Sequence, residues 1–217
     1  MTMLEEAVIT IILISWVAIV IKYLTRKIYY SKLREIYGEE LVRYINRKII
    51  HILAGGTVLL FPLIYDSFVI PVTLSLGVTI ALLIRRKSNN IMEWFQNESD
   101  DYEIHFTAMT TLLLFLGYLL GNPWYGVVPI AFMALGDGVT GIVRGIVLRR
   151  REKSWIGNLA MLIVNIPIGS ILGVPGIAAG IVAAIIEKFE FFGGKIDDNV
   201  TIPLISFLTI LAVDALM

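Results

Sequence analysis

Three side chains that could hold or protonate an anion stand at the start of an apolar run, in the stretch RKIIHILAGG. Arg47 and His51 are four positions apart, so they lie on the same face of a helix. Arginine and lysine donate charge-assisted hydrogen bonds to phosphate oxygens, and histidine exchanges a proton near neutral pH. We therefore interpret Arg47, Lys48 and His51 as candidate functional residues, and His51 above all, because an ionisable ring inside an apolar run needs a partner or a water-lined cavity. The alternatives are cations that snorkel to a membrane surface and a histidine that is satisfied by packing.

An acidic residue lies inside a longer apolar run, in the stretch ALGDGVTGIVRG. Asp137 is roughly 18 Å along a helix from the basic end of this run, near the middle of a hydrocarbon core about 30 Å thick. A lone carboxylate at that depth is costly, so Asp137 is a candidate proton acceptor or metal ligand. The flanking Gly136 and Gly138 predict a helix that is broken or opened so that its backbone can approach a ligand. Two further glycines, Gly141 and Gly145, are expected to pack helices together.

A basic connection, REKSWIGN, leads into the next apolar run. Lys153 stands beside Ser154, which we expect to be the N-cap of that helix. Because the free N–H groups at a helix N-terminus favour an anion, Lys153 is a candidate phosphate ligand. The arginines before it, Arg149 to Arg151, could serve only to orient the chain in a membrane.

Acidic residues also stand beside the last two apolar runs. Glu187 ends one run, and Asp198 lies in the stretch DDNVTIPL before the other. Carboxylate oxygens are the ligands that Mg²⁺ prefers, so Glu187 and Asp198 could converge on this ion. The alternative is that a residue of this stretch only caps the last helix, the candidates being Asp198, Asn199 and Thr201.

The composition predicts that membrane helices position these residues. Of the 217 residues, 57% are hydrophobic and 17% are charged, and the mean hydropathy is +0.81. We predict an all-α polytopic membrane protein, since about 20 apolar residues cross a bilayer as a helix. The first run follows Glu5 and Glu6 and has no small-residue cleavage site, so we expect it to be retained. Eight runs are predicted to span the membrane: Ala7 to Tyr23, Ile49 to Ile64, Phe68 to Ile84, Ile104 to Leu120, Trp124 to Leu148, Ile156 to Leu172, Val174 to Ile186 and Val200 to Leu216.

The distribution of lysine and arginine predicts an orientation. All 18 fall in four alternate connections: eight in 22 to 48, three in 85 to 87, five in 144 to 153 and two in 188 to 195. Basic residues near span ends stay in the cytoplasm, so we predict both termini outside and the candidate site on the cytoplasmic side. We predict one integral membrane domain over residues 1 to 217. Residues 1 to 48 would form the first helix and a basic connector, and residues 49 to 217 the helical core.

The composition also excludes several classes of protein. The chain has no cysteine, and so no disulfide frame, thiolate metal site or cysteine nucleophile. Its formal net charge is zero, so we expect no nucleic-acid partner. No GxxxxGK[ST] sequence occurs, and the GGK at Gly193 to Lys195 lacks the earlier glycine, which excludes a P-loop kinase. Cations, carboxylates and glycines around a membrane cavity favour phosphoryl transfer, in which positioning and charge neutralisation do most of the catalysis.

Four motifs, RKIIH, GDG, KSWIGNLAM and DDNVTIPL, occur in an order and at spacings that resemble one enzyme family. The chain resembles the CTP-dependent polyprenol kinase family, which includes dolichol kinases, phytol kinases and the fungal CTP-dependent diacylglycerol kinase. The likeness extends over positions 47 to 204. It implies an integral membrane enzyme that uses a divalent cation to transfer the γ-phosphoryl group of CTP to a lipid alcohol.

The resemblance also implies roles for individual residues. Those expected to bind the nucleotide are Arg47, Lys48, Gly136, Gly138, Lys153, Gly157 and Asn199. Those expected to be catalytic are Asp137 and His51, and those expected to bind Mg²⁺ are Asp137, Glu187 and Asp198. In the family, a glycine commonly stands eight positions after the first glycine of the GD motif. In this chain Arg144 holds that place and Gly145 follows, so the chain departs from the family pattern there. Arg144, Gly145 and His105 therefore receive no role.

Together these inferences predict a lipid alcohol with its tail in the bilayer and its hydroxyl at the cytoplasmic interface, where CTP arrives from water. The preferred acceptor is an isoprenoid alcohol such as dolichol, another polyprenol or geranylgeraniol. Asp137 either accepts the hydroxyl proton or binds the metal, and both roles stay open. The alternatives are a diacylglycerol-type kinase, a cytidylyltransferase acting on a lipid phosphate, and a secondary transporter, which usually has related halves that this sequence lacks.

Overall fold

The structure, a computed structural model, describes residues 2–98, 100–149, 152–189 and 197–217. Within these residues the chain forms helices and turns and no strand. The predicted all-α fold is therefore confirmed. Arg150, Arg151 and the stretch Gly193 to Lys195, which entered the inferences above, lie outside the described residues.

Long apolar helices fit the predicted integral membrane protein. Three of the predicted spans correspond to α7 (Tyr102–Leu119), α11 (Val174–Glu187) and α12 (Asp198–Asp214), which are shorter or less apolar than the rest. Eight spans therefore remain a prediction. In the part of the chain that the structure describes, five helical runs are long and apolar enough to cross a membrane: Met3–Tyr29, Glu39–Ile64, Val69–Lys87, Pro123–Leu148 and Trp155–Leu172.

The predicted basic connector, residues 22 to 48, is largely helical. It begins in the π-helical turn Val20–Leu24, which follows α1 (Met3–Ile19), and continues through α2 (Thr25–Tyr29) and α3 (Leu33–Tyr37). Gly38 then turns the chain with a φ of +83°, which side chains rarely adopt. The next helix, α4, starts at Glu39, ten residues before the predicted run, because Val42, Ile45, Ile49 and Ile52 recur at helical spacing among its charged residues.

A glycine pair directly after α4 lets the chain approach two neighbouring helices closely. α4 (Glu39–Leu53) continues through a 3₁₀ turn, Gly55–Leu60, into α5 (Phe61–Ile64), and α6 (Val69–Lys87) follows. A Cβ on Gly55 would lie 2.6 Å from the Phe106 ring of α7, and one on Gly56 would lie 2.7 Å from Leu135. The pair therefore lets this 3₁₀ turn approach both Phe106 of α7 and the helix that carries Asp137.

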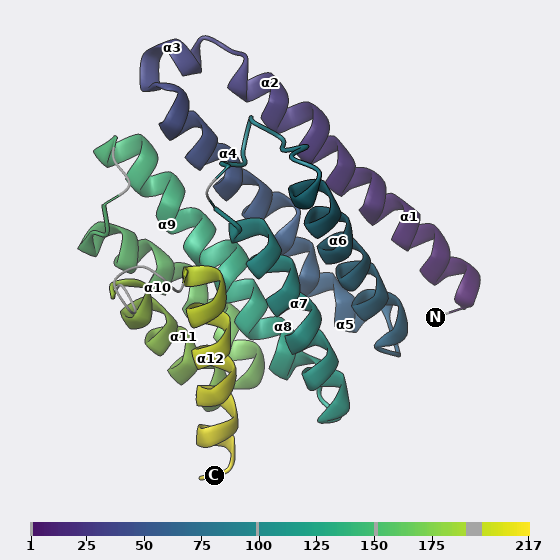
Figure 1. Ribbon diagram of the computed structural model, residues 1–217. Helices are drawn as coiled ribbons and strands as arrows, with labels where there is room; N and C mark the ends of the chain where they lie inside the picture. The colour runs from purple at the N-terminus through teal and green to yellow at the C-terminus, as the bar shows by residue number, and fades with distance from the viewer. Residues whose placement is uncertain (1, 99, 150–151, 190–196) are drawn as a thin grey trace.

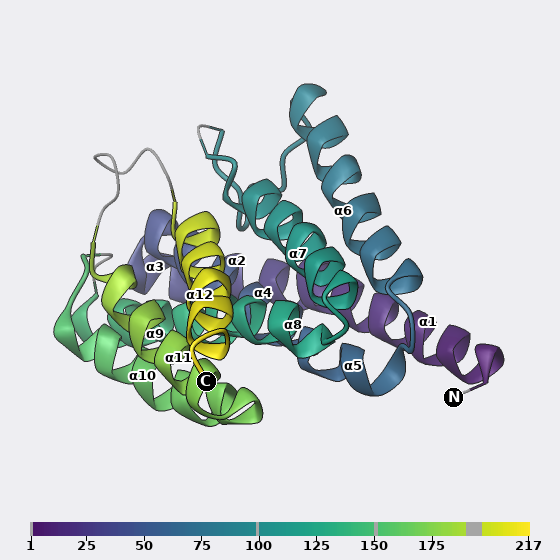
Figure 2. The same cartoon turned by 90° about the horizontal axis from the view of Figure 1, so that it is seen from below.

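The helix that carries Asp137 runs through the core. It comprises α8 (Pro123–Ala131), a π-helical turn, α9 (Gly138–Val143) and a second π-helical turn that ends at Leu148. Of the 18 residues that form the apolar stretch of this run, 78% are buried, against 6% in the first run, Met3–Tyr29. Figures 1 and 2 show α7, α10 (Trp155–Gly169), α11 and α12 around it.

The connections rich in lysine and arginine gather at one end of the helix bundle. Figure 1 shows the turn from α2 to α4, the end of α6 and the start of α10 toward the upper left. Both termini and the turn from α5 to α6 lie toward the opposite end. This arrangement agrees with the alternation of basic and non-basic connections, and the side that faces the cytoplasm stays a prediction.

Candidate functional site

The turn that carries Asp137 is π-helical. Residues Phe132–Asp137 form this wider turn, and α9 starts directly after it. The helix is continuous through these residues, so of the predicted break or opening at Gly136 and Gly138 the break is wrong, and the helix is only widened up to Asp137. A π-turn accommodates an extra residue while the backbone stays hydrogen-bonded, which costs less in an apolar environment than an open break. Such turns are frequent at functional sites.

Asp137 is paired with a cation from another helix. Lys48 Nζ of α4 lies 2.5 Å from Asp137 Oδ2, and His51 Nδ1, one turn further along α4, lies 3.8 Å from the same oxygen. All three side chains are buried. The expectation of a lone carboxylate is therefore wrong, because α4 supplies a neutralising charge that the sequence of α8 and α9 does not reveal. The structure does bring together the predicted residues Lys48, His51 and Asp137.

Glycines around this pair make room for neighbouring side chains. A Cβ on Gly141 would lie 2.5 Å from Lys48 Cγ, and one on Gly138 would lie 2.6 Å from Ile52 Cγ1. Gly136 abuts the Asn165 side chain in the same way, and a Cβ on Gly157 would lie 2.5 Å from Arg144 Nε. In the structure these glycines serve close helix packing, and a nucleotide contact by Gly136, Gly138 or Gly157 stays a prediction.

A second buried ion pair lies next to the first. Arg144 Nη2 of the second π-helical turn lies 2.7 Å from Glu187 Oε2 at the end of α11. Glu187 is 0% exposed, and its other oxygen, Oε1, has no hydrogen-bond partner among the described residues. Arg144, to which the sequence assigned no role, therefore holds one oxygen of a predicted metal ligand and leaves the other oxygen available.

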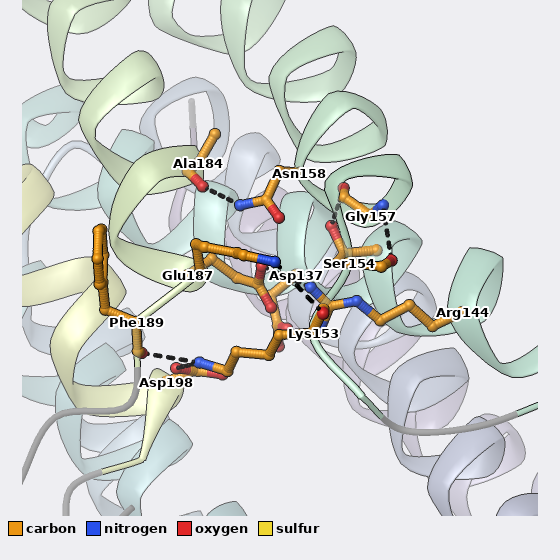
Figure 3. Close-up of polar contacts among 12 residues, drawn as sticks. Asp137, Arg144, Lys153, Ser154, Gly157, Asn158, Ala184, Glu187, Phe189 and Asp198 are labelled. Atoms are coloured by element: carbon orange, nitrogen blue, oxygen red, sulfur yellow. Dashed lines mark hydrogen bonds and ion pairs between the residues drawn. The ribbon is translucent and has the colours of Figure 1, made fainter. Parts of the chain in front are cut away.

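The third pair joins the connection before α10 to the first turn of α12. Lys153 Nζ lies 3.0 Å from Asp198 Oδ1 and donates to the Phe189 carbonyl at 2.9 Å (Figure 3). Ser154 is the N-cap of α10, as predicted, since its hydroxyl accepts from Gly157 N–H at 3.3 Å. Lys153 thus stands directly before the N-terminus of α10.

The cap of α12 is not the one expected. Asp197, rather than Asp198, Asn199 or Thr201, is the N-cap, and its Oδ1 accepts from Asn199 N–H at 2.7 Å. The capping alternative for Asp198 is therefore wrong. With the cap supplied one residue earlier, the Asp198 carboxylate in the first turn is free to contact Lys153.

Three carboxylates from three helices converge. One oxygen each from Asp137, Glu187 and Asp198 can be chosen so that all three lie within 4.8 Å of one another (Figure 3). Mg²⁺ binds oxygen at about 2.0 to 2.1 Å, so oxygens on opposite sides of the ion are about 4.2 Å apart. The donor set and the unpartnered Glu187 Oε1 therefore fit a hard cation after small movements. The pairs with Lys48, Arg144 and Lys153 offset the mutual repulsion of the acids.

Two predicted nucleotide-binding residues lie beside this cluster, with contacts to Tyr102. The Arg47 guanidinium lies 4.2 Å from the centre of the Tyr102 ring, and the Asn199 side chain donates to the Tyr102 carbonyl at 3.0 Å. His105, one turn further along α7, has Nδ1 2.5 Å from Asp197 Oδ2. Its position gives His105 a structural partner at the start of α12.

Two buried amides on α10 escaped the sequence analysis. Asn158 donates to the Ala184 carbonyl of α11 at 2.5 Å (Figure 3), and Asn165 lies against Gly136. The side-chain oxygens of both have no partner in the described parts of the chain. A signal was present, since the amides are seven residues apart in an apolar run and so share one face of the helix.

Comparisons with known proteins leave the resemblance as an expectation. No model of a protein family matches the sequence, and searches of curated proteins and of solved structures find no match either. The case for a function therefore depends on the geometry of the site together with the four motifs.

Proposed function

We propose that this protein is a membrane-embedded kinase that transfers the γ-phosphoryl group of CTP to the hydroxyl of a lipid alcohol, preferably an isoprenoid alcohol. The observation that carries the proposal is the convergence of Asp137, Glu187 and Asp198 within 4.8 Å, with a cation on each. Carboxylates that can hold a divalent cation, beside lysines that can hold phosphates, are the parts that phosphoryl transfer requires. The choice of CTP and of an isoprenoid acceptor derives from the resemblance.

The residues divide into two groups in this proposal. Asp137, Glu187 and Asp198 would hold Mg²⁺, which neutralises charge on phosphate oxygens when it is bound. Lys48 and Lys153 lie at the same carboxylates and would turn their Nζ groups to the phosphates of the nucleotide. Lys153 is the better placed for a ligand from water, because it stands at the end of the bundle.

The proton of the acceptor alcohol needs a base. The alcohol oxygen forms a bond to the γ-phosphorus, the bond from that phosphorus to the β,γ-bridging oxygen breaks, and CDP leaves. The hydroxyl proton passes to Asp137 or to His51, whose Nδ1 is buried without a hydrogen-bond partner among the described residues. His51 Nδ1 lies 3.8 Å from Asp137 Oδ2, so a hydroxyl near either group would lie near both.

Lys153 stands directly before α10, at the end of the bundle where the basic connections gather. Because such connections remain in the cytoplasm, the proposal places CTP binding on the cytoplasmic face. A lipid alcohol would reach the site from the bilayer, with its hydroxyl near the interface.

Transfer from labelled CTP tests the proposal. Detergent-purified protein is given γ-labelled CTP, Mg²⁺ and one of geranylgeraniol, dolichol, phytol or diacylglycerol. We expect a labelled lipid phosphate and an equal amount of CDP, with the isoprenoid alcohols as the best acceptors. Transfer to diacylglycerol alone would favour the diacylglycerol-type alternative. Pyrophosphate release with a lipid phosphate as substrate would replace the kinase by a cytidylyltransferase, and no reaction with any acceptor would overturn the proposal.

A further inference from the structure

An apolar cavity lies between α1, α4, α6 and α7. Its volume is about 270 Å³, and aliphatic and aromatic side chains from these helices form most of its wall, among them Leu13, Val17, Leu74, Val78 and Phe106. Its ionisable side chains other than a tyrosine lie toward the end where α7 begins, namely Arg47, His51 and Glu103. Hydroxyl groups also line it: Thr57, Tyr65, Ser75, Thr107 and Thr110. The cavity therefore has charged and ionisable groups at the His51 end and a mostly apolar wall elsewhere.

His51 connects this cavity to the candidate site. Its ring lines the cavity and stacks on Phe106 with the ring centres 4.4 Å apart. The same ring has Nδ1 3.8 Å from Asp137 Oδ2. A molecule in the cavity with a polar group at the His51 end would therefore present that group to the carboxylate site.

The side of the cavity formed by α1 is weakly packed. In the described chain, α1 contributes no fully buried side chain. Two polar contacts hold it: Trp16 donates to the Leu53 carbonyl at 2.7 Å, and the Thr10 and Tyr65 hydroxyls are 2.8 Å apart. Because α1 buries little apolar surface against the other helices, a hydrocarbon chain can enter beside it at small cost.

We propose that this cavity binds the single hydrocarbon chain of the acceptor alcohol, with the hydroxyl at His51 and Asp137; this inference rests on the proposed function. The lining follows the end of α4, the 3₁₀ turn and α5 from His51 to Tyr65, a path of roughly 20 Å at about 1.5 Å or more per residue. That length suits an extended chain. The volume of about 270 Å³ is just below that of small-molecule pockets, about 300 to 1,000 Å³, so the cavity suits one chain rather than the two of diacylglycerol.

Filling the cavity tests the proposal. Leu74 lines it from α6, so Leu74→Trp should obstruct the chain, and Val17→Trp should do so from α1. Leu208 is 54% exposed on α12, and Leu208→Trp is the matched control. We expect Leu74→Trp to lower kcat/KM about tenfold or more for geranylgeraniol and less than about threefold for a five-carbon isoprenoid alcohol, since pocket contacts discriminate by tenfold or more. An equal loss for both alcohols, or no loss in either cavity variant, would overturn the inference.

A binding experiment separates this inference from the proposed function. Geranylgeraniol carrying a diazirine is photo-crosslinked to the purified protein without CTP, and the labelled peptides are identified by mass spectrometry. We expect labels on α1, α4, α6 and α7 that excess geranylgeraniol displaces and that Leu74→Trp reduces. Diffuse labelling of the outer helix faces, or equal displacement by diacylglycerol, would contradict the single-chain cavity. Specific labelling without phosphoryl transfer would support the cavity while the proposed function fails.

Discussion

At the scale of single residues, Asp137 makes the sharpest prediction. If it is the base or a metal ligand, Asp137→Asn should lower turnover at least about a hundredfold. A lone acid in the bilayer would predict unchanged or higher stability for this variant. The observed pair predicts the opposite, because the change leaves the buried Lys48 cation unpaired, at a cost of about 3 to 5 kcal/mol. Turnover with CTP and the thermal midpoint in detergent are the measurements.

A neutral double variant is the control for Asp137. Lys48→Met combined with Asp137→Asn removes both charges, so we expect it to recover stability without recovering turnover. A folded Asp137→Asn protein that keeps more than about a tenth of the wild-type turnover would refute the assignment.

Lys153 offers the cleaner test of nucleotide binding. Its side chain is 19% exposed, so Lys153→Ala should disturb folding less than a change at the buried Lys48. A charge-assisted phosphate contact contributes about 1.5 to 3 kcal/mol, so the Kd for CTP should rise by roughly tenfold or more. Lys87, exposed at the end of α6, provides the control variant Lys87→Ala. Equal CTP affinity in both variants would remove Lys153 from the site.

The sequence revealed residues that are costly to bury but not their partners. Asp137, Glu187 and Lys48 stand out because a charged residue inside or beside an apolar run requires a reason. The pairing of Arg144 with Glu187 joins positions 43 residues apart, so no local pattern could predict it. The glycines beside Asp137 suggested an open backbone, whereas they give room to Asn165 and Ile52 on other helices.

At the scale of helices, close approach at Gly141 makes the next prediction. A Cβ there would lie 2.5 to 2.8 Å from Lys48 Cγ, Cδ and Cε, so Gly141→Ala should displace the lysine. We expect a loss of about 1 to 3 kcal/mol in stability, typical of overpacking, together with lower turnover. The thermal midpoint and the CTP-dependent activity measure the two effects.

Gly77 of α6 is the matched control for Gly141. A Cβ there would meet nothing within 4 Å, so Gly77→Ala should be neutral or stabilising by up to about 1 kcal/mol. Equal midpoints for the two variants would show that packing at Gly141 does not hold Lys48.

Apolar runs predicted where the helices lie but not their local geometry. The apolar composition of Trp124 to Leu148 was enough to predict a helix there, because this helix lies in the core and most of its residues are apolar and buried. The π-helical turn before Gly138 contacts α4 and α10, and the periodicity of one helix contains no sign of such contacts or of the turn. α4 extended further than its apolar run because an amphipathic helix needs only one apolar face.

At the scale of the whole molecule, the prediction concerns orientation. The chain has no cysteine, so single cysteines can be introduced without background labelling. Ser67→Cys, in the turn from α5 to α6, should react with a membrane-impermeant maleimide from the outside of intact cells. Lys87→Cys, at the end of α6, should react only after permeabilisation. Labelling of both positions from one side would overturn the predicted topology.

The three ion pairs of the site also affect the order in which ligands bind. Asp137, Glu187 and Asp198 each already have a cation, so a divalent ion that arrives alone leaves any lysine that it displaces from Asp137 or Asp198 without a counterion. A nucleotide that arrives alone must likewise separate lysine from carboxylate. Each ligand therefore removes the obstacle to the other, and linkage requires that each raise the affinity of the other by one common factor, typically about 5 to 150. We expect calorimetric titration to show Mg²⁺ binding that is weak without CTP and strong with it, and equal affinities would contradict this. Such a pocket would bind Mg²⁺ firmly only together with the nucleoside triphosphate, even in a cell rich in magnesium.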